Sequence, residues 1–286
     1  MRINHNISSM VVQGALYQTT RSLSQSLERL STGLRINRAS DDAAGLGVSE
    51  NLLTQVNGTA QASRNAQDGI AALNVAEGAA NEVSSMLQRM RELAVQSAND
   101  TLTSTERSYT NSEYQALSQE IDRISQVTNY NRQDLLSTTA NRFGQSGSAL
   151  WVDANHTVGV DSITITIDTL TTGALGIGTF GAAGAKSTYV SDQISAVNAI
   201  SALDTAINSV NTMRANIGAF VNRLEDAINN LNVSNTNQQA AESQIRDVDF
   251  ATETSNYTRN QILMQSATAM LAQANALPAS VMTLLK

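Results

Sequence analysis

The chain of 286 residues is 41% apolar but only 4% aromatic and has a single proline, which suits long, slender helices better than a thick globular core. Its formal net charge of −7 argues against nucleic-acid binding, which needs a positive surface, and the absence of cysteine leaves no disulfide or thiolate metal site. No run of 18 apolar residues predicts a membrane span, and no apolar stretch follows Arg2 as in a signal peptide, so we expect any export to use a route without a cleaved signal.

The N-terminal segment is the first predicted helix. Leucines at heptad-compatible spacing predict a coiled-coil seam, and they are Leu16, Leu23, Leu27, Leu30 and Leu34. Gly33 can end this helix, because glycine adopts the left-handed conformation at a helix C-terminus without strain. The seam therefore needs a partner helix from elsewhere.

The stretch LSTGLRINRASDDAAGLGVSE, residues 30–50, follows this seam. Gly45 and Gly47 form half of a dinucleotide-binding fingerprint, but Glu50 stands where the third glycine belongs and no strand precedes the glycines. Nucleotide binding is therefore disfavoured, and we interpret the stretch as a mechanical joint between helices.

Charged residues concentrate in this joint. Ser40 is predicted to cap the next helix, with Asp41 and Asp42 in its first turn, where the helix dipole favours anions. Arg35 and Arg38 lie in the connection, where they can bond carbonyl groups or a neighbouring subunit.

Two further helices are predicted in the N-terminal half. The longer one carries an unbroken seam of Leu73, Ala76, Ala80, Val83, Leu87, Met90 and Ala94. A shorter helix follows, and the spacing of Thr103 and Glu106 predicts a capping box at its start. One face of this helix is formed by Tyr114, Leu117, Ile121 and Ile124.

The middle of the chain has a different pattern. Residues 148–170 contain the alternating, β-branched run ITITI, separated from ALWV by a turn region, and this predicts a β-hairpin. Residues 171–188 are rich in glycine and alanine, and we expect them to be a linker and the least structured part of the chain.

The C-terminal third has the clearest periodicity. A seam with nine apolar positions out of ten runs through Ile200, Leu203, Ile207, Val210, Arg214, Ile217, Val221, Leu224, Ile228 and Leu231. It stops at polar residues near Asn235. A second seam is predicted nearly to the end of the chain, at Leu263, Ala267, Met270, Ala274, Leu277, Val281 and Leu284.

These patterns predict a mainly α fold. Both halves of the chain would form a long coiled-coil bundle or rod with a small β-hairpin in the middle, and the terminal helices would pair with each other or offer their seams to neighbours.

No catalytic, metal or cofactor site emerges from the sequence. The Asp247-Val248-Asp249 run lacks the glycine and distal glutamate of a calcium loop and is better interpreted as a helix start. The two histidines, His5 and His156, form no HExxH motif, and the acidic pairs are adjacent in the chain rather than convergent. We expect a protein that is not an enzyme.

The chain resembles bacterial flagellins in three blocks. The first is the 30–50 stretch, the second is QRMRELAVQSAND at 88–100, and the third is ESQIRDVDFATE at 242–253 followed by residues 261–286. The resemblance covers about 1–140 and 190–286, and it implies a structural subunit that polymerises into the flagellar filament for motility.

The resemblance implies two layers in that filament. Segments 1–44 and 241–286 would pair as the inner coiled coil, and residues 45–240 would form the rod, so the chain is similar to a minimal flagellin without outer domains. It also implies export through the flagellar type III channel, an extracellular location, and as partners other copies of the chain, hook-associated junction and cap proteins, and an export chaperone at the C-terminal segment. A hook–filament junction protein and another secreted coiled-coil protein remain alternatives.

The resemblance further implies recognition by animal Toll-like receptors. The family's receptor-active motif, RxRELxVQSxN, is intact from Arg89 to Asn99, and Arg89, Leu93 and Glu113 match the residues at that surface. The alternative is that these residues serve filament contacts first.

Overall fold

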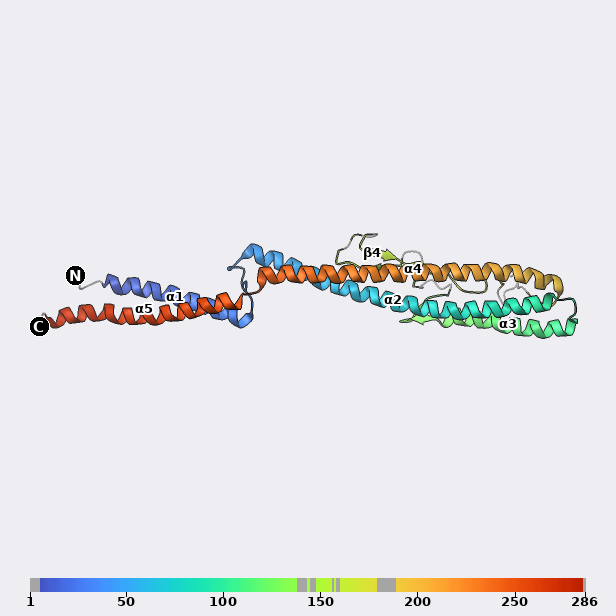
Figure 1. Cartoon of the computed structure of the whole chain (residues 1–286), viewed down its shortest axis with the longest axis horizontal. Coiled ribbons are helices and arrows are strands. Elements are labelled where there is room, and N and C mark those ends of the chain that lie inside the picture. Colours follow the sequence, from blue (N-terminus) through green and yellow to red (C-terminus); the bar gives the residue numbers. More distant parts are fainter. Residues whose placement is uncertain are drawn as a thin grey trace. The chain divides into compact units, whose positions relative to one another are not determined.

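The computed structural model describes residues 6–137, 143–144, 148–155, 157, 160–178 and 189–284, the last eight without their side chains. The fold is mainly α, as predicted (Figure 1). Two compact units form, a terminal unit of Met1–Val56 with Thr236–Lys286 and a central unit of Asn57–Asn235. In chain order the elements are α1 (Ile7–Thr32), α2 (Ala43–Ala98), α3 (Ser104–Val127), β1 (Asn129–Tyr130), β2 (Gln133–Asp134), β3 (Ala149–Trp151), β4 (Ser162–Thr164), α4 (Gln193–Arg246) and α5 (Phe250–Leu284).

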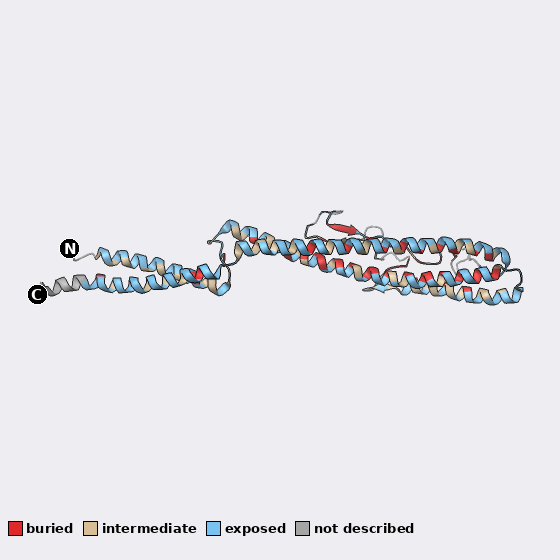
Figure 2. Ribbon diagram, in the orientation of Figure 1, coloured by how far each residue is buried: buried red, intermediate tan, exposed pale blue. Residues whose placement is uncertain are grey.

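The central unit is built around the predicted seams of α2 and α4. All seven predicted α2 positions are fully buried, and the α4 seam alternates buried with partly buried positions down to Leu231. Figure 2 shows the buried residues gathered along these helices. Ion pairs flank the core, with Arg91 Nε 2.6 Å from Asp204 Oδ1 and Arg214 Nη2 2.8 Å from Glu77 Oε1. The heptad pattern therefore predicted this interface correctly.

The third helix of the central unit, α3, also follows its prediction. Tyr114 and Ile121 are buried in the common core. The capping box is present, because Glu106 N donates to Thr103 Oγ1 and Thr103 N donates to Glu106 Oε2, at 3.4 and 2.7 Å.

The predicted hairpin is formed by β3 and β4, which pair antiparallel with Leu150 opposite Ile163. Alternation continues beyond β4, since Ile163, Ile165 and Ile167 are buried and the residues between them are exposed. The hairpin approaches α2 closely at Gly58, where a Cβ would lie 2.6 Å from the Cβ of Ala154. Glycine at that position is therefore needed for the close approach.

Two parts of the central unit differ from the sequence expectations. Residues 171–178 do not behave as a loose linker, because Leu175 and Ile177 are buried and the Thr172 hydroxyl donates to Asp122. Residues 179–188 lie outside the described part of the chain. A second hairpin, β1–β2, was not predicted, because its turn has Arg132 rather than glycine at a left-handed position.

The terminal unit contains α1 packed on α5, together with the first part of α2, the last part of α4 and the connections at 33–42 and 247–249. The contact follows the predicted seams in part, because the predicted positions Leu16, Ala267 and Ala274 are buried or partly buried. Leu23 and Leu30 are half-buried on α1, whereas Leu27 is 53% exposed. On α5 the less exposed positions are Glu253, Asn256, Tyr257, Asn260, Met264, Ala267, Leu271 and Ala274. Among the described residues, no helix has the length and apolar character needed to cross a membrane.

Candidate functional site

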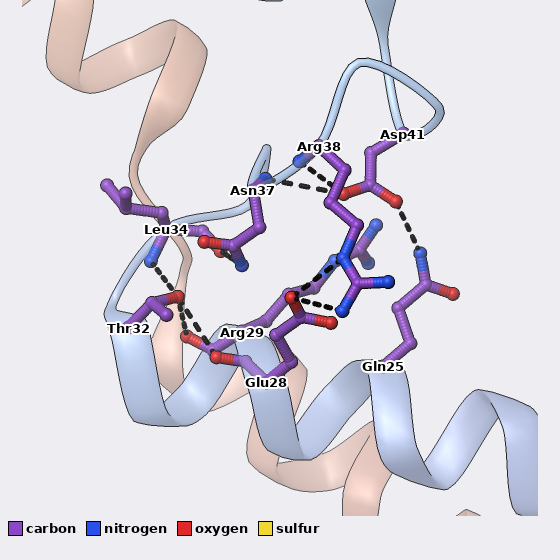
Figure 3. A network of polar contacts seen from close by, with 8 residues as sticks. All are labelled: Gln25, Glu28, Arg29, Thr32, Leu34, Asn37, Arg38 and Asp41. Atoms are coloured by element: carbon purple, nitrogen blue, oxygen red, sulfur yellow. Dashed lines mark hydrogen bonds and ion pairs between the residues drawn. The ribbon is translucent and has the colours of Figure 1, made fainter.

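The joint after α1 begins with a glycine-dependent turn (Figure 3). Gly33 adopts φ 75°, and its N–H donates to Arg29 O at 2.9 Å, which closes the last turn of α1. The Thr32 hydroxyl donates to Glu28 O and accepts from Leu34 N at 3.2 Å. The predicted helix end at Gly33 is therefore correct, and the chain leaves α1 in a fixed direction.

The next residues pair with the connection between α4 and α5. Leu34 and Asp247 form an antiparallel bridge, flanked by hydrogen bonds from Arg35 N to Arg246 O at 2.6 Å and from Val248 N to Gly33 O at 3.0 Å. The Arg35 guanidinium also donates to Ile245 O, at 2.6 Å from Nη2. The N- and C-terminal segments are thus joined by main-chain hydrogen bonds as well as by helix packing.

Asp41 organises the turn before α2. Its Oδ2 accepts from the N–H groups of Arg38 and Asn37, at 3.1 and 3.3 Å, and its Oδ1 accepts from Gln25 Nε2 at 3.0 Å. Desolvation raises the pKa of Asp41, but these hydrogen bonds together outweigh it, so the pKa lies below its ordinary value. Gln25 was not identified from the sequence, because a polar residue on an exposed helix face gives no signal of its own.

The helix start is two residues later than predicted. We expected Ser40 to cap α2, but the helix begins at Ala43, and Asp42 Oδ1 accepts from Gly45 N at 2.8 Å. Ser40 and Asp41 belong to the preceding turn. Capping falls to Asp42 because Asp41 is already bonded to the turn, and either carboxylate suits a helix N-terminus.

The two glycines near this start have different roles. A Cβ at Gly45 would clash with the Asp42 carboxylate and would lie 2.9 Å from Cδ1 of the buried Ile36, whereas nothing lies within 4 Å of a Cβ at Gly47. The Gly45-Leu46-Gly47 run is therefore explained at its first glycine by the close approach of the preceding connection to the start of α2, and it needs no ligand.

Ion pairs connect the elements of the terminal unit. Arg38 Nη2 lies 3.0 Å from Glu28 Oε1, but both side chains are well exposed and the pair contributes little. Arg29 Nη1 lies 3.7 Å from Oε2 of Glu253, a buried residue on α5. Both arginines predicted to contact a neighbouring subunit, Arg35 and Arg38, thus have partners within the chain, and a contact to another subunit stays a prediction.

The terminal helices also carry large apolar side chains that nothing in the described chain covers. On α5, Leu263 is 48% and Met270 is 59% exposed, although both belong to the predicted seam. On α1, exposed apolar residues continue from Ile7 to Tyr17 and Leu27. Leu277, Val281 and Leu284 lie in α5, but their side chains are outside the described part. Apolar surface of this kind marks an interaction site.

The predicted receptor surface has one buried member. Arg89 and Glu113 are exposed and paired, with Nη2 2.9 Å from Oε1, and Arg89 also contacts Glu92. Leu93 is only 1% exposed and belongs to the core of the central unit. A partner approaching this surface would meet the charged pair and not Leu93.

Acidic residues near the α5 start act as a cap. Asp249 Oδ1 accepts from Ala251 N at 2.9 Å and its Oδ2 accepts from the Thr252 hydroxyl, and these bonds lower the pKa of Asp249, the Thr252 side chain most strongly. The interpretation of Asp247–Asp249 as a helix start is confirmed, since α5 begins at Phe250. No group of His, Asp or Glu among the described residues is arranged to hold a metal ion.

Comparisons with known proteins match most of the chain. The bacterial flagellin N-terminal helical region matches residues 3–141, and the bacterial flagellin C-terminal helical region matches residues 200–285. The flagellar filament 33 kDa core protein of Treponema phagedenis is 44% identical, and a flagellin of Halalkalibacterium halodurans is 43% identical, each over 100% of both chains. A crystal structure of Bacillus cereus flagellin is 33% identical over 59% of this chain and 88% of that one, with a TM-score of 0.46.

Proposed function

The chain belongs to the bacterial flagellin family, and we propose that it assembles by covering the exposed faces of its terminal helices with neighbouring copies. It is a structural subunit of the flagellar filament, not an enzyme, and it polymerises with itself. Identity over the full length of filament core proteins favours this role over the hook–filament junction alternative. A repeated, non-closing contact between identical subunits produces an open helical filament.

The exposed apolar face of the terminal unit is the observation that supports this mechanism. Leu27, Leu263 and Met270 are each about half exposed or more, while the α1–α5 contact uses positions next to them in the chain, namely Ser26, Met264 and Leu271. A two-helix pair with so little buried area is marginal in water. We therefore propose that segments 1–44 and 241–286 become fully ordered on assembly, as the inner layer, and that residues 45–240 form the next layer.

The joint at 33–42 has a matching role in this proposal. Its main-chain bridge to 245–248 and the Asp41 network hold the N- and C-terminal segments together where each leaves the inner layer. We propose that Arg35, Arg38, Ser40, Asp41 and Asp42 form the hinge and its subunit contacts. Replacing Asp41 and Asp42 together by Lys should reduce polymerisation more than it reduces the thermal stability of the central unit.

A truncation tests the assembly mechanism most simply. Removal of residues 263–286 deletes most of the α5 seam, and we expect a soluble monomer with a folded central unit. Electron microscopy after salting out should show filaments for the full chain and none for the truncated chain. Filaments from the truncated chain would contradict the proposal.

Point substitutions separate assembly from folding. Leu263→Glu and Met270→Glu place charge on the exposed α5 face, so they should prevent polymerisation while leaving the thermal unfolding of the monomer unchanged. Val160→Glu is the matched control, because Val160 is 77% exposed in the central unit. Equal loss of assembly in the control would assign the effect to added charge alone.

The resemblance to flagellins also supports a proposal about export and further partners. We propose that the chain leaves the cell through the flagellar type III channel without a cleaved signal peptide and that the filament is extracellular. Hook-associated junction and cap proteins at the filament ends, and an export chaperone on the C-terminal segment, are the further partners. The chaperone proposal can be tested by adding a purified chaperone, which should slow polymerisation if it binds the C-terminal segment.

Receptor recognition is a separate proposal, supported by the exposed Arg89–Glu113 pair. Arg89→Glu would place three acidic side chains together and should reduce Toll-like receptor activation by the monomer. Because Leu93 is buried, Leu93→Ala should act mainly through stability of the central unit. A normal response to the Arg89 variant would contradict direct contact.

A further inference from the structure

The start of α1 is joined to α5 by one asparagine. Asn6 is the N-cap of α1, and its Oδ1 accepts from Ser9 N at 3.1 Å. The other end of the same amide is used as well, because Asn6 Nδ2 donates to the carbonyl oxygen of Ala274 at 2.9 Å. A single side chain therefore caps one helix and bonds the backbone of another.

A carbonyl inside a helix is normally occupied by the N–H four residues later. For Ala274 that residue is Pro278, which has no N–H, and α5 nevertheless continues through it to Leu284. Ala274 is 8% exposed, so its carbonyl has little access to water. Leaving a buried carbonyl without a donor is costly, and Asn6 supplies the donor that the proline removes.

The apolar contact alone does not fix how α1 aligns with α5. The less exposed α5 positions Asn260, Met264, Ala267, Leu271 and Ala274 repeat at heptad spacing, and so do those of α1. The Leu34–Asp247 bridge sets the alignment at the joint, but at the far end of the two helices a local shift of seven residues would again place small and apolar side chains opposite one another. It would also bring Asn6 to Ala267, whose carbonyl already has the N–H of Leu271 as its donor.

We propose that Asn6 and Pro278 form a register lock: the proline leaves one acceptor open on α5, and Asn6 can occupy it in only one alignment of the terminal helices. The role of the lock in the filament rests on the proposed pairing of the two ends in the inner layer. A polar position that specifies alignment within an apolar seam is a known device in coiled coils.

A double-mutant cycle on the full chain tests the lock. Asn6→Ser keeps a good N-cap residue but its side chain is too short to reach Ala274 O. Pro278→Ala restores the N–H and with it a donor within α5. We expect Asn6→Ser to raise the critical concentration for polymerisation about 5- to 10-fold in the natural chain and less than about 2-fold in the Pro278→Ala background. An equal effect in both backgrounds would overturn the lock.

Cysteine cross-linking tests the alignment of α1 with α5 directly. The natural chain contains no cysteine, so only the introduced pairs can react. In assembled filaments, Asn6→Cys should cross-link with Ala274→Cys and not with Ala267→Cys, which lies about 10 Å away along the helix. Equal cross-linking of both pairs would overturn the lock even if a proline variant failed to assemble. Failure of the unmodified chain to polymerise would instead refute the proposed function.

Discussion

The central and terminal units use the same kind of heptad pattern in different ways. In the central unit, the seams of α2 and α4 share one core with residues of α3 and the hairpins, and Figure 2 shows the buried residues along these helices. In the terminal unit, the buried apolar residues among those described are Ile36, Val56 and Ala274. Large side chains such as Met270 and Tyr17 remain exposed there, at 59% and 73%.

This difference shows that an apolar seam in a sequence does not reveal whether a helix of the same chain or another copy of the chain covers it. The central unit contains most of the buried apolar residues of the described chain. Under the proposed assembly mechanism, the sparsely buried terminal unit would gain stability from an added partner, by mass-action coupling between folding and assembly. In the proposed assembly, one chain combines a central unit with its own core and terminal helices that are covered by other copies of the chain.

The largest expected effect is a contrast between two leucines. Leu87→Ala in the fully buried α2 seam should destabilise the central unit by about 2–5 kcal/mol, through lost burial and a cavity. Leu27→Ala on the exposed side of α1 should change monomer stability by less than about 0.5 kcal/mol but raise the critical concentration for assembly. Thermal unfolding and sedimentation measure the two quantities. A large loss of monomer stability in the Leu27→Ala variant would contradict the proposed difference between the two units.

Two glycines at the start of α2 should respond in opposite directions. Gly45→Ala brings a Cβ within 2.9 Å of Ile36 and should cost about 1–3 kcal/mol in the assembled filament. Gly47→Ala meets open space and should gain about 0.5–1 kcal/mol through helix propensity. The dissociation temperature of the filaments gives the sign of each. Equal changes in dissociation temperature for the two variants would mean that the joint adjusts to a Cβ at Gly45 without cost.

The Asp41 network should depend on pH. Because the pKa of Asp41 is lowered in the folded chain, its contribution is fully present above the ordinary aspartate pKa of about 3.9 and is lost as pH falls through the lower folded value. Asp41→Asn should therefore speed hydrogen exchange at the N–H groups of Asn37 and Arg38 at neutral pH, and the difference from the natural chain should vanish in strong acid. Asp226→Asn, on an exposed face of α4, is the matched control and should show no such change. A pH-independent difference would contradict the charge-based account.

The smallest effect is expected at the β1–β2 turn of the central unit. Arg132 adopts φ 64°, which an L-residue reaches at a cost, whereas glycine reaches it freely. Arg132→Gly should stabilise the central unit by about 0.5 kcal/mol, after the greater chain entropy of glycine in the unfolded state is subtracted. Thermal unfolding of the monomer would show it, and a destabilisation would indicate that the arginine side chain makes a stabilising contact.

The sequence predicted the central unit better than the terminal unit for a physical reason. On α2 and α4, polar residues surround a narrow apolar seam, so spacing alone identifies the covered face. On α5, Leu263 and Met270 lie outside the α1 contact while Met264 and Leu271 lie within it, so apolar residues on several sides leave the register open. The shift of the cap from Ser40 to Asp42 has a similar origin, because adjacent capping residues compete and only the fold decides between them.

Hydrogen exchange in the monomer and in the filament tests the central claim most directly. We expect segments 7–32 and 250–276 to exchange rapidly in the monomer and to become strongly protected on assembly, while residues 57–135 are protected equally in both states. Strong protection of both terminal helices in the free monomer would contradict the claim that copies of the chain complete its ends.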